Sequence, residues 1–196
     1  MHGCLPPQRY EEIKEAVIDM LEECEVTHYP IDPFALARKL RYILRPYSSL
    51  SLNKQQWALG KSKDGFSQLE EDLKSGMLRF VIYYNDRRKN KGRIRWTILH
   101  EIGHCYLGHH SLKHINKKVI EEEANHFAKY AIAPPPLVKA MGVRSADELK
   151  AVFITSQEAA EHSFEYYTGW RIYQRRHPGL SACEIRLLEM VTGIPA

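Results

Sequence analysis

The chain has 196 residues, of which 44% are hydrophobic, 27% charged and 10% aromatic, and this composition excludes a disordered or low-complexity protein. The net charge of +4 is too weak by itself to indicate nucleic-acid binding. No apolar run reaches the roughly 18 residues that a membrane span needs. The N-terminus lacks the apolar core of a signal peptide, and the four cysteines form no close pair. We therefore expect a cytoplasmic protein with reduced thiols and no membrane partner.

The start of the chain predicts two helices. Apolar residues recur at helical spacing over Ile13–Cys24, and Pro6-Pro7 before them suits a helix start. A short second helix is predicted over Pro33–Leu40, because Asp32 can cap it and proline is favourable in its first turn.

The middle of the chain predicts a small antiparallel sheet. Arg41–Tyr47 and Leu78–Tyr84 are rich in β-branched and aromatic residues and are bounded by Gly, Pro, Asn or Asp. A weaker third strand is expected near Gln56–Lys61.

From Ile94 onward the pattern is helical, apart from Pro134–Pro136. Three sequences of the form Ser/Thr-x-x-Glu, typical of capping boxes, predict helix starts at Ser145, Thr155 and Ser181. The predicted fold class is α+β, with the sheet packed on the helices.

We expect two parts that pack together as one unit. Residues 1–134 form the core with the N-terminal helices, and residues 135–196 form a C-terminal helical subdomain. Residues 146–160 look like a helix-turn-helix. Because Glu158, Glu161 and neighbouring side chains are acidic where phosphates would lie, we interpret this unit as a structural hairpin and do not expect direct nucleic-acid binding.

Residues 100–104 read His-Glu-Ile-Gly-His, an HExxH motif. Residues four positions apart lie on one face of a helix, so the imidazoles of His100 and His104 can bind one zinc ion. Glu101 then lies beside the metal, where its carboxylate can accept a proton from the bound water. The motif therefore predicts a zinc site with Glu101 as the catalytic base.

The third ligand is expected from the helix predicted around residues 120–131. Glu121 lies at the edge of its apolar stripe, about 60° from Ala124, and Glu123 lies about 100° away on the other flank. Glu121 is the predicted ligand and Glu123 the alternative. Asn125 shares an edge with Glu121, which suits a hydrogen-bond partner for a histidine ligand.

His110 is a further candidate, because metzincins place a third histidine ten residues after the first. Their motif also needs glycine seven residues after the first histidine, where this chain has Leu107 and places Gly108 one step late. We interpret His109, His110 and His114 as solvated histidines.

These segments resemble the ImmA/IrrE family of zinc metallo-endopeptidases. The matching stretches are residues 30–37, Phe80–Asp86, Trp96–His104 and Glu121–Ala128, the last continuing to Pro134. The resemblance covers most of the chain. It implies a zincin-like core in which the HExxH helix and a glutamate helix hold the metal.

The Glu121–Ala128 segment is also similar to the glutamate helix of gluzincins. This similarity places the zinc-binding glutamate at Glu121 and a carboxylate partner at the position of Asn125. The chain departs from the pattern there, because asparagine is neutral, although its amide oxygen can still accept a histidine N–H. It also has Ala133 where the family usually has Met or Leu.

The resemblance implies a zinc-dependent endopeptidase of limited specificity. Its expected substrate is a helix-turn-helix repressor encoded nearby, in a mobile element or stress regulon, and its expected cofactor is Zn²⁺. The alternative is a non-catalytic regulator that binds the repressor or DNA.

Residues 87–95 contain six basic side chains in nine positions. A solvated connection between a strand and a helix explains this run. The alternative is an electropositive rim that attracts an acidic protein segment or nucleic acid.

Overall fold

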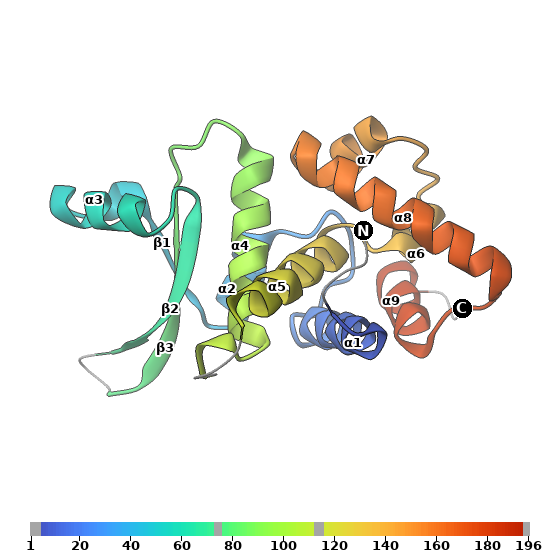
Figure 1. Cartoon of the computed structure of the whole chain (residues 1–196), viewed down its shortest axis with the longest axis horizontal. Coiled ribbons are helices and arrows are strands. Elements are labelled where there is room, and N and C mark those ends of the chain that lie inside the picture. The colour runs from blue at the N-terminus through green and yellow to red at the C-terminus, as the bar shows by residue number, and fades with distance from the viewer. Residues whose placement is uncertain (1–4, 73–75, 112–115, 194–196) are drawn as a thin grey trace.

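The computed structural model describes residues 5–72, 76–111 and 116–193. Figure 1 shows how its helices and strands are arranged. A small sheet lies at one end of the molecule, two central helices follow, and the C-terminal helices lie at the other end (Figure 1). The helices are α1 (Pro7–Glu23), α2 (Pro33–Lys39), α3 (Leu52–Lys61), α4 (Lys91–Tyr106), α5 (Lys117–Ile132), α6 (Pro135–Ala140), α7 (Ala146–Phe153), α8 (Gln157–Arg176) and α9 (Ala182–Thr192), with short 3-10 turns η1 (Tyr47–Ser49) and η2 (His109–Ser111). The predicted α+β class is confirmed.

The sheet is mixed, and the prediction of an antiparallel sheet is wrong in this respect. Its strands β1 (Ile43–Pro46), β2 (Gly65–Glu71) and β3 (Leu78–Tyr84) lie in the order β1-β3-β2. β2 is antiparallel to β3, but β1 is parallel to β3. Parallel neighbours need a long connection, and the segment between β1 and β3 is long enough to contain α3 and β2. Because β2 stands last in the order β1-β3-β2, it is an edge strand.

The strand predicted near Gln56–Lys61 is wrong, because these residues belong to α3. The sequence of α3 is rich in good helix formers such as Leu, Lys, Gln and Ala. The third strand is β2, which begins four residues after α3 ends. Its sequence, GFSQLEE, has few β-forming residues, so its conformation depends on pairing with β3 and not on local propensity.

Both predicted N-terminal helices are confirmed, and the side chain of Asp32 caps α2 by accepting a hydrogen bond from the Phe34 amide. The HExxH helix α4 begins at Lys91, three residues earlier than predicted. The reason is a cap, since the Asn90 side chain accepts a hydrogen bond from the Arg93 amide.

α4 packs against β2 and β3 on one side and against α5 on another. Gly103 permits the close approach of α4 and α5, because a Cβ atom built on it would lie 3.1 Å from Cδ1 of Phe127. Leu99, Ile102 and Phe127 are fully buried in the main apolar cluster. The two helices that carry the predicted site are thus held together by tight apolar packing.

The C-terminal helices pack on this core, and side chains of α7, α8 and α9 belong to the same apolar cluster as those of α1, α4 and α5. Ser145 and Ser181 cap α7 and α9 as predicted. The predicted start at Thr155 is wrong by one residue, because the hydroxyl that caps α8 is that of Ser156. The division at residue 134 stays a prediction.

Gly92, in the first turn of α4, lies against the connection between α7 and α8. A Cβ atom at this position would lie 2.3 Å from the Ser156 amide nitrogen. The C-terminal helices therefore pack directly on the helix that carries HExxH. Among the described helices, none combines the length and apolar character needed to cross a membrane.

Candidate metal centre

His100, His104 and Glu121 converge where α4 meets α5. The Nε2 atoms of His100 and His104 are 3.0 Å apart. The Glu121 carboxylate oxygens lie 3.4 Å from Nε2 of His100 and 3.8 Å from Nε2 of His104. Within the described ranges, these three residues form the group of His, Cys, Asp and Glu side chains that could hold a metal ion.

The separations fit zinc. Two ligands at about 2.0–2.1 Å from a tetrahedral metal lie about 3.3–3.4 Å from each other, and the three measured separations of 3.0, 3.4 and 3.8 Å surround this value. Two imidazoles and one carboxylate also match a frequent catalytic zinc donor set, which leaves the fourth position open. The residues present therefore suit the ion that the HExxH motif predicts.

The charges at the centre favour cation binding. Hydrogen bonding to His100 lowers the pKa of Glu121, so this carboxylate is ionised. Burial, followed by the charge of His100, lowers the pKa of His104 to about 3, so its imidazole is neutral. Burial lowers the pKa of His100, but the hydrogen bond to Glu121 and the nearby carboxylates outweigh it, and the net direction is upward. His100 is the ligand at which protons compete with a metal.

Glu101 is buried beside this group, and its side chain has a partner on the edge strand. The Ser67 hydroxyl donates a 2.7 Å hydrogen bond to Oε2 of Glu101, and Nε2 of His110 lies 3.0 Å from the same hydroxyl. Burial raises the pKa of Glu101. A carboxylate with a raised pKa is suited to accept and return a proton near neutral pH. Sequence analysis missed Ser67, which lies in the strand that it did not predict.

Glu123, the alternative ligand, lies away from the donor group. Residues two positions apart on a helix point about 200° from each other, so the side chains of Glu121 and Glu123 leave α5 on different sides. The Glu123 carboxylate accepts hydrogen bonds from Arg9 at 2.7 and 3.0 Å and lies 2.8 Å from Nε2 of His109. The Arg9 and His109 hydrogen bonds outweigh burial and lower the pKa of Glu123.

The interpretation of the histidines after HExxH as solvated is wrong for His109, which is 7% exposed and contacts Glu123 and His104. His110 is exposed, but it is hydrogen-bonded to Ser67 and is not among the grouped donors. His114 lies outside the described residues. His109 follows the HExxH motif closely in the sequence, and this closeness could have indicated that it contacts the metal centre. No local pattern marks Arg9 as a partner of Glu123.

Asn125 lies one turn after Glu121 on α5 and lines the same cleft. Its side chain is among the groups that raise the pKa of His100. Nδ1 of His100 is buried and has no hydrogen-bond partner within the described residues. The assignment of Asn125 as a partner of a histidine ligand stays a prediction.

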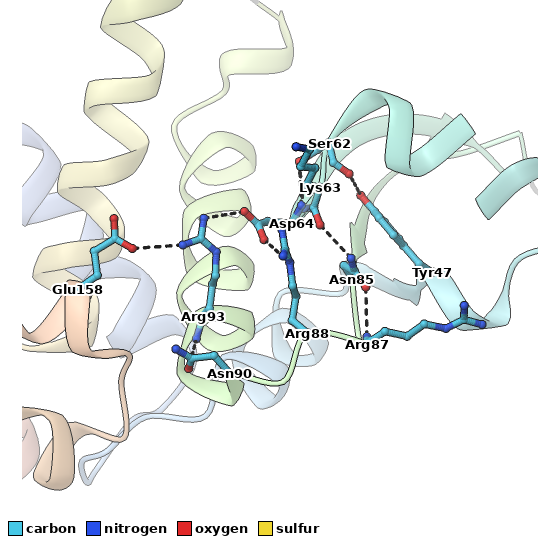
Figure 2. Close-up of polar contacts among 11 residues, drawn as sticks. Tyr47, Ser62, Lys63, Asp64, Asn85, Arg87, Arg88, Asn90, Arg93 and Glu158 are labelled. Atoms are coloured by element: carbon cyan, nitrogen blue, oxygen red, sulfur yellow. Dashed lines mark hydrogen bonds and ion pairs between the residues drawn. The ribbon is translucent and has the colours of Figure 1, made fainter. Parts of the chain in front are cut away.

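The centre lies in a cleft of about 850 Å³. One wall is formed by the start of β2 and the other by α5 and α8, and α4 lies between them. At the rim, Arg93 lies between Asp64 and Glu158 and pairs with both, at 2.7 and 3.2 Å (Figure 2). This volume lies within the range of about 300–1,000 Å³ that is typical of ligand clefts.

The basic run at residues 87–95 contributes to this rim through internal ion pairs. Arg88 and Arg93 both pair with Asp64, at 2.8 and 2.7 Å (Figure 2), and Arg95 donates to the Ile31 carbonyl oxygen. Hydrogen bonding to Arg93 lowers the pKa of Asp64. Two carboxylates, Asp64 and Glu158, therefore offset part of the positive charge of the run.

Comparison with known proteins gave one family match. The model of the Peptidase_M78 family, described as the IrrE N-terminal-like domain, matches residues 59–165. This segment runs from the end of α3 into α8 and includes the whole candidate metal centre. No curated protein and no solved structure gave a significant match to the chain.

Proposed function

Because the chain belongs to the Peptidase_M78 family of ImmA/IrrE-type metallopeptidases, we propose that it is a zinc-dependent endopeptidase of limited specificity. The observation that carries this proposal is the convergence of two imidazoles and one carboxylate within 4.8 Å of one another, in a cleft that also contains a buried glutamate. The ligands are His100, His104 and Glu121, with Asn125 as a partner of His100.

Each residue of the centre has a distinct task in peptide hydrolysis. Zinc, when bound, supplies Lewis-acid chemistry that polarises the scissile carbonyl and makes water more acidic. Glu101 accepts the proton of the attacking water and returns it to the leaving amine. The Ser67 hydroxyl binds Oε2 of Glu101 and so orients the carboxylate for this transfer. The raised pKa of Glu101 matches both steps, since the group must gain and lose a proton within one cycle.

We infer that the substrate is a helix-turn-helix repressor whose gene lies close to the gene of this protein, as the family resemblance implies. The mixed charge of the cleft rim, where Asp64 and Glu158 flank Arg93, favours a polypeptide over a polyanion such as DNA. A non-catalytic regulator is the alternative function. It gives no role to a buried carboxylate placed beside three metal donors, so we favour hydrolysis.

The test uses the zinc-loaded protein and a proteome-derived peptide library read by mass spectrometry. Wild type should cut at a restricted set of bonds, and Glu101→Gln should keep its zinc but cut at least about 100-fold more slowly. Glu165→Gln, at an exposed position on α8, is the matched control and should behave as wild type. Purified repressors from neighbouring genes then test the substrate class.

Zinc binding without cleavage of any peptide by wild type would contradict the enzymatic proposal. If wild type and Glu101→Gln then bound a repressor equally and left it intact, the non-catalytic regulator would be the better description.

A further inference from the structure

A continuous chain of polar contacts, buried at the histidines and half-buried at Arg9, leads from the metal centre to the N-terminal helix. Nδ1 of His104 lies 2.9 Å from Nδ1 of His109. Nε2 of His109 lies 2.8 Å from Glu123, whose carboxylate receives both Nε and Nη2 of Arg9. The His109 and Glu123 side chains are only 2% and 8% exposed. Four residues from α1, α4, η2 and α5 thus form one line of hydrogen bonds.

The partners in this chain determine where the hydrogens lie. The Glu123 carboxylate only accepts, so the atom that faces it, Nε2 of His109, must carry a hydrogen. In a neutral imidazole the other nitrogen is then an acceptor, so Nδ1 of His109 accepts from Nδ1–H of His104. Nε2 of His104 is left with a free lone pair.

That lone pair is directed at the candidate metal position, since Nε2 of His104 is the atom that lies 3.0 Å from Nε2 of His100 and 3.8 Å from Glu121. The opposite hydrogen placement would put a hydrogen on this nitrogen and prevent it from binding a metal. Metal-binding histidines commonly donate their other N–H to a carboxylate or carbonyl, which orients the ring. Here His109 stands between the ligand and the carboxylate.

Arg9 fixes the outer end of the chain. Its guanidinium binds both oxygens of Glu123, and this two-point contact keeps the carboxylate ionised and in one orientation. Arg9 lies on α1, outside the segment 59–165 that the family model matches. The N-terminal helix therefore contributes to the centre from a part of the chain that the matched domain does not include.

We propose that Arg9, Glu123 and His109 are positioning residues that hold His104 in the Nδ1–H tautomer and in the orientation required for metal binding. This inference rests on the proposed metal centre at His100, His104 and Glu121. It assigns a task to Glu123, which is not a ligand in this arrangement, and to the buried His109.

The first measurement is the zinc affinity of the full-length protein, by competition with a chromophoric chelator at neutral pH. Glu123→Gln should bind zinc about 10–100-fold more weakly, as loss of a partner behind a metal ligand usually does. The amide has a single acceptor oxygen. If this oxygen takes the place of Oε2, which contacts both His109 and Nη2 of Arg9, the amide nitrogen faces Nε of Arg9, donor to donor, and the negative charge behind His109 is lost. Glu122→Gln, the same change one position earlier on α5, is the matched control and should keep wild-type affinity.

The second measurement reads the tautomer directly in zinc-free protein. Long-range proton–nitrogen spectra of imidazole-labelled samples distinguish Nδ1–H from Nε2–H forms. His104 should be the Nδ1–H form in wild type and in Glu122→Gln. This preference should be measurably weaker in Glu123→Gln, because a neutral amide oxygen accepts less strongly from Nε2–H of His109 than a carboxylate does. A residue that only stabilised the fold would not move this signal.

If Glu123→Gln fails to fold, the double variant Arg9→Met/Glu123→Met tests the same point, because it leaves no unpaired buried charge. Its zinc affinity should also fall about 10–100-fold. Unchanged zinc affinity, or an unchanged His104 tautomer, in a folded variant would overturn the inference while leaving the proposed function intact. Failure of wild type to bind zinc would instead contradict the proposed function.

Discussion

Ser67 and Glu101 lie 34 positions apart in the sequence, and the hydroxyl of the first donates a 2.7 Å hydrogen bond to the carboxylate of the second. This bond joins the edge strand β2 to the HExxH helix. It places a residue of the β2 wall of the cleft in contact with the proposed catalytic base.

We predict that Ser67→Ala lowers the peptidase rate at neutral pH about tenfold, because a hydrogen bond to a charged group contributes about 1.5 kcal/mol or more. The Ser67 hydrogen bond lowers the pKa of Glu101, against the larger upward effect of burial. Its loss should therefore raise that pKa and move the acidic limb of the rate profile to higher pH. The measurement is kcat/KM against pH for both proteins, with Ser67→Thr as the variant that restores the hydroxyl. An acidic limb that moved to lower pH would contradict this role.

Glu121→Ala should reduce zinc affinity more than any other single change on α5, because it removes one of three ligands. Asn125→Ala should weaken binding by about 10–100-fold, as changes behind a ligand do. His110→Ala should leave zinc affinity unchanged, since its ring contacts Ser67 and not the donor group. Chelator competition on the three variants gives the order. Metal loss in His110→Ala with retention in Glu121→Ala would show that the wrong third ligand has been assigned.

Zinc affinity should fall as the pH is lowered below neutral. A metal and a proton compete for the same lone pair, and the upward shift of the pKa of His100 makes this residue the first ligand to be protonated. His104, with a pKa of about 3, stays neutral throughout this range. Titrations at fixed ionic strength between about pH 8 and 5.5 test this. An affinity that stayed constant across the titration of His100 would be inconsistent with histidine ligation.

Gly92→Ala should destabilise the fold by about 1–3 kcal/mol, because the new methyl group must displace backbone atoms. Its Cβ would lie 2.3 Å from the Ser156 amide nitrogen and 2.4 Å from the Thr155 carbonyl carbon. Gly169→Ala, in the exposed middle of α8, is the control. A Cβ atom there meets nothing within 4 Å, so alanine should stabilise the helix by up to about 1 kcal/mol. Chemical denaturation of the zinc-free proteins measures both, and equal effects would contradict the close packing of α4 on the α7–α8 connection.

The sequence alone determined those parts of the centre that depend on local geometry. His100 and His104 share a face because they are four residues apart on a helix, and this spacing holds wherever the helix lies. The position of Glu121 at the edge of an apolar stripe follows from the same periodicity. The strand Leu78–Tyr84 was predicted with its observed bounds, because a dense run of β-forming residues specifies it locally.

Tertiary structure decided everything that joins distant segments. The parallel direction of β1 and the strand conformation of β2 depend on pairings with β3 that local patterns do not encode. The same is true of the contacts that Ser67, His109 and Arg9 make. Each is a common polar residue whose partner is chosen by how the strand and helices pack, since a hydrogen bond requires only that two groups be brought within about 3 Å. The sequence thus specified which residues can bind the metal, and the packing of α1, α5, η2 and β2 around α4 decided which residues hold them in place.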